Sequence, residues 1–321
     1  MQIRYSWLDS LRGLAIFLVV IGHVIQFLYC HDNDGYRKCI DWNIIYSFHM
    51  PLFFMISGYS YDICKDRFTI VKRAKQLLVP FAVWALINAI YNDSLYIWRL
   101  EYFIISPSNG GLWFLYALFF MSVIYYLIDR ISNRGGYKQN IYYLLILFSL
   151  LFFIENKVGG FYGTKEITYN IIFYAIGAYL HRYDISIHNN YILLTLATIS
   201  VICGYSKMYY LEMISNMAII QRSISIVLTI PILLFIYGVW RKARIVEEEK
   251  SFIKDLSHIG KYTLGIYAIH YYLICSLPSI QTYSRLSIII TSLGIIILTV
   301  FIIQIINRNK ILRKILLGNW K

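Results

Sequence analysis

The feature that most constrains this chain is a series of apolar stretches, each about as long as a helix that crosses a lipid bilayer. Crossing the hydrocarbon core takes about 20 mainly apolar residues in a helix. We count ten such stretches, at residues 8–29, 43–61, 74–91, 111–129, 141–155, 167–181, 191–206, 217–240, 260–277 and 286–306. The sequence therefore predicts an all-α polytopic membrane protein, a bundle of about ten transmembrane helices.

The composition excludes most soluble proteins. Hydrophobic residues make up 59% of the chain and charged residues only 15%, whereas about a quarter of an ordinary soluble chain is charged. The spans leave little sequence for a soluble domain. We therefore expect residues 1–321 to form a single integral-membrane domain with no appended soluble domain.

The basic residues predict how the bundle is oriented. The chain has 30 Lys and Arg against 17 Asp and Glu, but these cations follow the spans instead of forming one basic face, which argues against nucleic acid as a partner. With the first residues in the cytoplasm, 22 cations fall inside and 8 outside, the outer ones being Arg37, Lys38, Arg99, Lys157, Lys165, Lys207, Arg222 and Arg285. The positive-inside rule thus favours cytoplasmic termini.

Three histidines lie in predicted spans at one depth. His23 and His49 are each six residues from the outer ends of their spans, and His270 is seven residues from its outer end. Imidazole can take and return a proton near neutral pH, so this coincidence predicts a catalytic layer, with Tyr267 as a hydrogen-bond donor. Two alternatives stay open. Each histidine forms a hydrogen bond to a neighbouring helix of the bundle without a catalytic role, or the three histidines together bind a metal. A metal is disfavoured because no carboxylate shares the layer.

Arg12 lies eleven residues before His23 in the first span. Eleven residues make three helical turns plus 20°, so both side chains share one face, about 16 Å apart along the axis. Asp9, three residues before Arg12, can pair with it. Arg12 is predicted at the cytoplasmic boundary and His23 in the outer half of the membrane.

A basic segment opens the third span, with Lys72, Arg73 and Lys75. Such residues often satisfy the positive-inside rule or touch anionic lipid. Alternatively, together with Arg12, they bind the phosphates of a cytoplasmic cofactor by charge-assisted hydrogen bonds. The chain has no GxxxxGK[ST] loop, so a nucleotide hydrolase is not supported.

Trp113 enters the fourth span from outside, where aromatic residues commonly mark the membrane interface. It is also a candidate platform for a sugar ring, and Ser57 is a further candidate substrate contact. Cys30 and Cys39 lie in the first outer loop, where either a local disulfide or two unpaired thiols can be expected. The five cysteines lack ligand spacing such as CxxC, so no metal site is predicted.

Several segments together resemble the membrane acyltransferase family 3, and within it the branch of fucose 4-O-acetylase-like sugar O-acetyltransferases. The resembling segments are Trp7 to Ala15 with Gly22-His23, Ser47 to Tyr59, Arg73 to Phe81, Leu112 to Leu115, and Gly260 to His270. Their combination is specific because the Arg-x10-His spacing and the FHMPLFFMISGY helix occur in one chain.

The resemblance implies a ten-helix enzyme of the bacterial cytoplasmic membrane. Such an enzyme takes an acyl group, usually acetyl, from cytoplasmic acyl-coenzyme A and delivers it to a hydroxyl of an envelope or exported glycan that can be lipid-linked. In this family an arginine and a histidine of the first helix are regarded as essential, so the resemblance implies that role for Arg12 and His23. A histidine in the second helix is typical of this branch more than of the whole family, and His49 corresponds to it. Some members append an extracellular esterase-like domain, whereas this chain ends in a short basic tail.

The resulting hypothesis makes His23 either the general base for the sugar hydroxyl or a transient acyl acceptor. His49 and His270 would orient it or stabilise the oxyanion. Two rival functions stay open. One is a transporter of a small solute or lipid-linked glycan that uses the histidines for proton coupling. The other is transfer of succinyl or another acyl group, or transfer to an amino acid, lipid or antibiotic.

Overall fold

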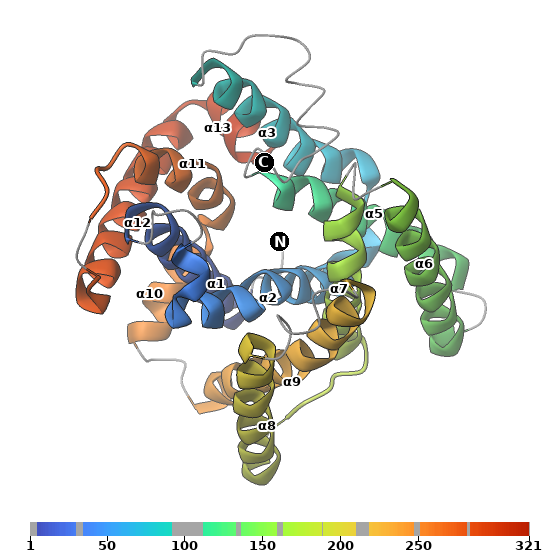
Figure 1. The fold of residues 1–321 in the computed structure, drawn as a ribbon. Coiled ribbons are helices and arrows are strands. Elements are labelled where there is room, and N and C mark those ends of the chain that lie inside the picture. Colours follow the sequence, from blue (N-terminus) through green and yellow to red (C-terminus); the bar gives the residue numbers. More distant parts are fainter. Residues whose placement is uncertain are drawn as a thin grey trace. The chain divides into compact units, whose positions relative to one another are not determined.

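The structure is a computed structural model. It describes residues 5–29, 35–91, 112–132, 136–158, 163–187, 189–209, 218–246, 251–280 and 283–320. Every regular element in these ranges is a helix, which confirms the all-α prediction (Figure 1). Cys30 lies outside the described residues, so the predicted Cys30–Cys39 pairing stays a prediction.

Each of the ten predicted spans falls on a helix. The helices are α1 Ser6–Val24 with a following π-helical turn Ile25–Tyr29, α2 Ile40–Cys64, α3 Ile70–Tyr91, α5 Trp113–Ser132, α6 Gly136–Val158, α7 Thr164–Arg182, α8 Asn190–Tyr209, α9 Ala218–Val246, α11 Thr263–Cys275 and α12 Arg285–Arg308. Of the described helical segments, four are long and apolar enough to cross a membrane: Ser6–Tyr29, Trp113–Ser132, Ser223–Lys242 and Arg285–Arg308. Ten crossings and cytoplasmic termini remain predictions.

Within the described ranges, two short α-helices were not expected from the apolar stretches. They are α10 Ser251–Gly260 and α13 Lys310–Leu317. Both are too short and too polar to span a bilayer, because their apolar residues recur at helical spacing between charged ones. The predicted span 260–277 also starts too early, since α10 ends at Gly260 and a turn separates it from α11.

The contacts divide the chain into two compact units. The first contains residues 1–56 and 183–304, and the second contains residues 57–182 and 305–321. In the first unit, α1 packs against α10 and α11, and α8 packs against α9. In the second unit, α5 packs against α3, α6 and α7, and α13 packs against α3.

Glycines let backbones approach closely in the first unit. A Cβ at Gly13 would lie 2.0 Å from the Leu256 carbonyl oxygen, and one at Gly260 would lie 1.8 Å from that of Asp9. Only a residue without a side chain fits where α1 and α10 meet at these distances. At Gly22 a Cβ would lie 2.6 Å from the Tyr46 ring, so this glycine admits Tyr46 of α2 beside the turn that carries His23.

In the second unit, the end of the chain covers a break in the hydrogen bonding of α3. Pro80 has no N–H for the Gln76 carbonyl four residues earlier. Gly318, which ends α13 in the left-handed conformation (φ 61°), lies against that oxygen, since a Cβ there would be 2.2 Å away. Trp320 Nε1 donates to the Lys75 carbonyl at 2.8 Å and Trp84 Nε1 to that of Leu316 at 3.0 Å. The tail is thereby fixed to α3.

The start of α2 carries an exposed ion pair. The Asp41 carboxylate accepts hydrogen bonds from Arg285 Nε at 2.8 Å and from the Tyr283 hydroxyl at 2.7 Å. Partial burial would raise the pKa of Asp41, but the hydrogen bonds and the positive charge of Arg285 outweigh it and hold this pKa below its ordinary value. The carboxylate therefore stabilises the folded state above about pH 4.

We expect Asp41→Asn to lower the thermal midpoint at pH 7 by a small amount, on the order of 1 °C, because exposed ion pairs are weak. A carboxyl with a lowered folded-state pKa loses its contribution as the pH falls from its unfolded pKa through its folded one. The difference between the variant and the wild type should therefore shrink below about pH 4. Thermal unfolding in detergent over a pH series measures it, and a difference that grows on acidification would contradict the assignment.

Candidate active site

Two of the predicted histidines are in direct contact. His23, near the end of α1, and His270 of α11 face each other with His23 Nδ1 2.9 Å from His270 Nε2. Their rings are nearly parallel, with centroids 5.0 Å apart and planes inclined by 13°. The His270 side chain is buried, at 1% exposure, whereas His23 is half-buried. The structure thus brings together residues that are 247 positions apart in the sequence.

Hydrogen bonding determines which nitrogens carry protons. His270 Nδ1 lies 2.8 Å from the Ile266 carbonyl oxygen; a carbonyl can only accept, so Nδ1 is the donor. In a neutral ring Nε2 is then an acceptor, and the proton shared with His23 must sit on His23 Nδ1. Two neutral rings are favoured because a charge on a buried ring is costly. This chain of bonds leaves the Nε2 of His23 with a lone pair, as a general base requires.

His49 joins this pair through Tyr46. The Tyr46 ring lies 4.6 Å from that of His49 and 6.4 Å from that of His23. The Tyr46 hydroxyl donates to Gln26 Oε1 at 3.1 Å, in the π-helical turn that follows α1. His49 is buried, at 3% exposure, and its Nδ1 donates to the Ile45 carbonyl at 2.8 Å. The sequence analysis did not predict Tyr46 or Gln26 as site residues. A single tyrosine is uninformative in a chain with 30 of them, and Gln26 belongs to no motif.

The other predicted residues of the first unit lie on the same helices. The ring centroid of Tyr267 is 6.2 Å from that of His270. Arg12 Nη1 donates to Asp9 Oδ1 at 2.7 Å, so the predicted pair is present. The Asp9 side chain is 1% exposed, while that of Arg12 is 31% exposed. Arg12 is therefore oriented by a buried carboxylate and still reaches the surface of its unit.

The remaining candidates belong to the second unit. Arg73 turns inward, with Nε donating to Ser122 Oγ at 3.2 Å. Lys72 and Lys75 are exposed, and Lys75 Nζ lies 5.4 Å from the Trp320 ring centroid. Ser57 and Trp113 are partly buried. Because Arg12 and the histidines lie in the first unit, their cooperation with these residues stays a prediction.

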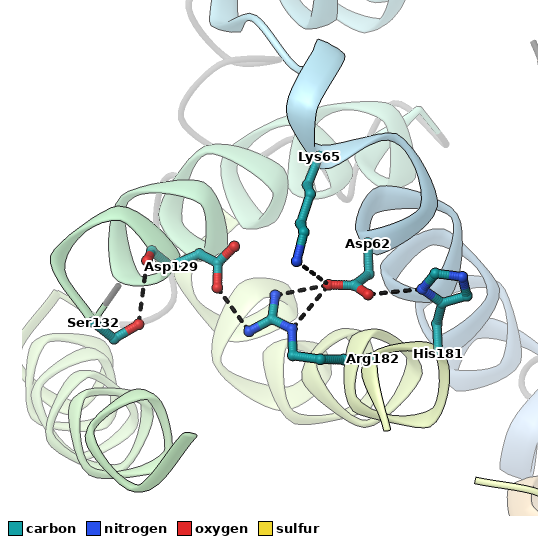
Figure 2. A network of polar contacts seen from close by, with 6 residues as sticks. All are labelled: Asp62, Lys65, Asp129, Ser132, His181 and Arg182. Carbon is teal, nitrogen blue, oxygen red and sulfur yellow. Dashed lines mark hydrogen bonds and ion pairs between the residues drawn. The ribbon is translucent and has the colours of Figure 1, made fainter. Parts of the chain in front are cut away.

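The second unit also contains a partly buried network of ion pairs that the sequence analysis did not predict. Figure 2 shows Arg182 of α7 between two carboxylates, donating to Asp62 Oδ1 of α2 at 2.7 Å and to Asp129 Oδ1 of α5 at 2.8 Å. His181 Nδ1 lies 2.7 Å from Asp62 Oδ2, and Lys65 Nζ 3.8 Å from Oδ1. The one signal in the sequence is that Asp62 and Asp129 both lie at the ends of apolar stretches. The network ties three helices of this unit together.

Residues 5–308 match the family model Acyl_transf_3, described as an acyltransferase domain. This match covers most of the chain. The protein belongs to acyltransferase family 3. The Arg12 and His23 segment and the α2 segment with His49, on which the resemblance rests, both lie inside the matched region.

Curated relatives support the family and its membrane setting. Nodulation protein NolL of Mesorhizobium japonicum is 33% identical over 134 residues, which cover 36% of this chain and 34% of that protein. Nodulation protein NolL of Sinorhizobium fredii is 40% identical over 80 residues, 24% of this chain and 22% of that protein. Inner membrane protein YcfT of Escherichia coli is 27% identical over 223 residues, 56% of this chain and 57% of that protein. In each case less than two thirds of the relative is covered.

No solved structure matches this family member significantly. Within the described ranges, no three His, Cys, Asp or Glu side chains gather as a group that could hold a metal ion.

Proposed function

We propose that this protein is a membrane O-acyltransferase that moves an acyl group, in the first instance acetyl, from cytoplasmic acyl-coenzyme A to a hydroxyl of an envelope or exported glycan. Membership of acyltransferase family 3 supports the reaction class. The observation that carries the proposal is the His23–His270 hydrogen bond, because it leaves His23 Nε2 unprotonated and oriented.

In the proposed reaction, His23 Nε2 accepts the proton of the acceptor hydroxyl as its oxygen attacks the thioester carbonyl carbon. The tetrahedral intermediate collapses, the carbon–sulfur bond breaks, and the coenzyme A thiolate leaves and takes up the proton. His270 acts on His23, since its Nε2 accepts a hydrogen bond from the Nδ1–H of His23 and so stabilises the imidazolium that forms there. Tyr267 is proposed to donate to the developing oxyanion. His49, whose one N–H is used on the Ile45 carbonyl, is proposed to orient the site by accepting a hydrogen bond at its Nε2.

The same lone pair could instead attack the thioester carbonyl carbon, which breaks the carbon–sulfur bond, releases the coenzyme A thiolate and leaves an acyl-imidazole on His23. The acceptor hydroxyl would then attack this acyl group, which frees the imidazole, and its proton would pass to the thiolate. A rapid acid or base quench of single turnovers with radiolabelled acetyl-coenzyme A distinguishes the two routes. A protein-bound label that disappears on addition of the glycan supports the acyl-histidine route. Direct transfer without a labelled protein supports the general-base route.

The proposed donor site uses Arg12, oriented by Asp9, with Arg73 and its neighbours Lys72 and Lys75. These cations would hold the phosphates of coenzyme A at the cytoplasmic side. Half of the hydrocarbon core is about 15 Å thick, close to the axial separation of about 16 Å expected between Arg12 and His23 on one helix. Trp113 and Ser57 are proposed to contact the acceptor.

We expect Arg12→Gln and Arg73→Gln each to raise the KM for acetyl-coenzyme A about tenfold, because each removes a charge-assisted hydrogen bond to a phosphate. The kcat at saturating donor should change much less. Initial rates of the purified protein in nanodiscs, at varied donor concentration, measure both constants. Exposed Lys261→Gln is the matched control. An unchanged KM would show that Arg12 and Arg73 do not bind the donor, and would leave the positive-inside rule as the reason for these cations.

The proposed function itself is tested by mass spectrometry of cell-envelope glycans with and without the protein, followed by transfer of the labelled group by the purified protein. The gain of an acetyl mass on a glycan hydroxyl supports the proposal, and a succinyl mass would revise the donor. If the purified protein instead moves a glycan or a small solute across the membrane of proteoliposomes and does not bind coenzyme A, the rival transport function is established.

A further inference from the structure

The proline in the helix that carries His49 leaves a backbone oxygen without its helical donor. In an α-helix the carbonyl of residue i accepts from the N–H of residue i+4. Pro51 has no N–H, so the Ser47 carbonyl, four residues earlier in α2, loses that bond. A buried carbonyl without a donor is costly, and in a membrane protein a neighbouring helix must supply one.

The donor comes from a lysine on another helix of the same unit. Lys207 of α8 places its ammonium nitrogen 2.6 Å from the Ser47 carbonyl oxygen and 2.8 Å from Thr229 Oγ1 of α9. Thr229 Oγ1 in turn donates to the Ser225 carbonyl at 2.7 Å. Because the threonine proton is used in that bond, Lys207 is the principal donor to Ser47. The positive-inside count, by contrast, treated Lys207 as a cation of the outer surface.

Using a lysine as this donor costs free energy, because a charged group has to leave water. Lys207 is partly buried where it contacts Ser47 and Thr229, and withdrawing a charge from water carries a desolvation cost that its hydrogen bonds must offset. The carbonyl it meets is only two residues from His49, which lies between Ser47 and Pro51 in the interrupted turn. The His49 ring is itself oriented by this turn, since its Nδ1 donates to the Ile45 carbonyl. Whatever sets the geometry of the turn therefore sets the direction of His49 Nε2.

We infer that Lys207 is a positioning residue of the histidine site: its ammonium replaces the backbone donor that Pro51 lacks, and so fixes the turn of α2 that carries His49. Thr229 holds the ammonium in place. The inference rests on the proposed function for its effect on catalysis, but the hydrogen-bond replacement itself does not depend on any activity.

The replacement can be tested by restoring the missing backbone donor. Lys207→Met keeps the length of the side chain and removes its donors. Pro51→Ala returns an N–H that can bond to the Ser47 carbonyl. We expect Lys207→Met to lower kcat at least tenfold with less than a twofold change in the KM for acetyl-coenzyme A, and to lower the thermal midpoint by on the order of 5 °C. Adding Pro51→Ala should return kcat to within threefold, and the midpoint to within about 2 °C, of the Pro51→Ala protein.

Exposed Lys261→Met is the matched control and should behave as wild type. Full activity and stability of Lys207→Met would overturn the inference, as would a double variant that is no better than Lys207→Met. Should Lys207→Met fail to fold, recovery of folded protein by Pro51→Ala supports the inference and no recovery overturns it. If wild type transfers no acyl group, the proposed function fails while the thermal cycle still tests the role of Lys207.

Discussion

Replacing His23 with alanine is expected to lower kcat for acyl transfer about 10²- to 10⁴-fold, the usual contribution of a general base. The protein should remain folded, because His23 is half-buried and sits near the end of α1. Initial rates in nanodiscs, together with size-exclusion chromatography in detergent, measure both properties. His258→Ala, at an exposed position of α10, controls for loss of any imidazole. Wild-type turnover of the His23 variant would remove this residue from the mechanism.

The partner His270 provides a sharper test of the proposed proton arrangement. His270→Ala should lower kcat about 10- to 100-fold, as is typical when the residue that orients a functional imidazole is lost. His270→Gln keeps an oxygen that can accept from His23 Nδ1, so it should retain more activity than the alanine variant. Equal losses in both variants would contradict the assignment of His270 as an acceptor.

Replacing Arg182 with methionine is expected to destabilise the protein by about 3 kcal/mol or more. The change leaves Asp62 and Asp129, whose side chains are 3% and 12% exposed, without their shared cation, and breaking a buried ion pair on one side is strongly destabilising. The thermal midpoint in detergent should fall by on the order of 10 °C.

The matched control for this change is Arg130→Met, one residue after Asp129 on α5 but exposed and in contact with the Tyr126 ring. It should shift the midpoint by only a degree or two. The thermal midpoint of Asp62→Asn should shift by an amount between those of Arg182→Met and Arg130→Met, because Arg182 keeps Asp129 as a partner. Equal shifts for Arg182→Met and Arg130→Met would show that the network in Figure 2 does not stabilise the second unit.

Helix positions could be predicted from the sequence because apolar length is a local property. The predicted span 8–29 and the observed helical segment Ser6–Tyr29 agree within two residues at the start. The short helices α10 and α13 could not be found by that criterion, since their amphipathic faces are stabilised by packing on α1 and α3. Gly260 shows the same effect: it belongs to the end of α10 because α1 approaches it there.

The candidate site divides in a similar way. The depth of His23, His49 and His270 follows from counting residues along predicted spans, and it pointed to one layer. The count could not show that His23 and His270 bond to each other, nor that Tyr46 lies between His23 and His49. Those contacts depend on which helix faces meet, which needs long-range packing. The contacts of Lys207 with Ser47 and Thr229 could not be predicted for the same reason, because a cation near the end of a span resembles any other topological charge.

The amino-acid sequence by itself determined the all-helical architecture and the residues able to move a proton within it, because helix length and imidazole chemistry do not depend on distant neighbours. The tertiary structure alone decided which nitrogen of His23 is left free and what replaces the donor missing at Pro51. Both depend on hydrogen bonds between helices far apart in the chain. Such bonds form only where side chains meet within about 3 Å, and that proximity is a property of the packed molecule.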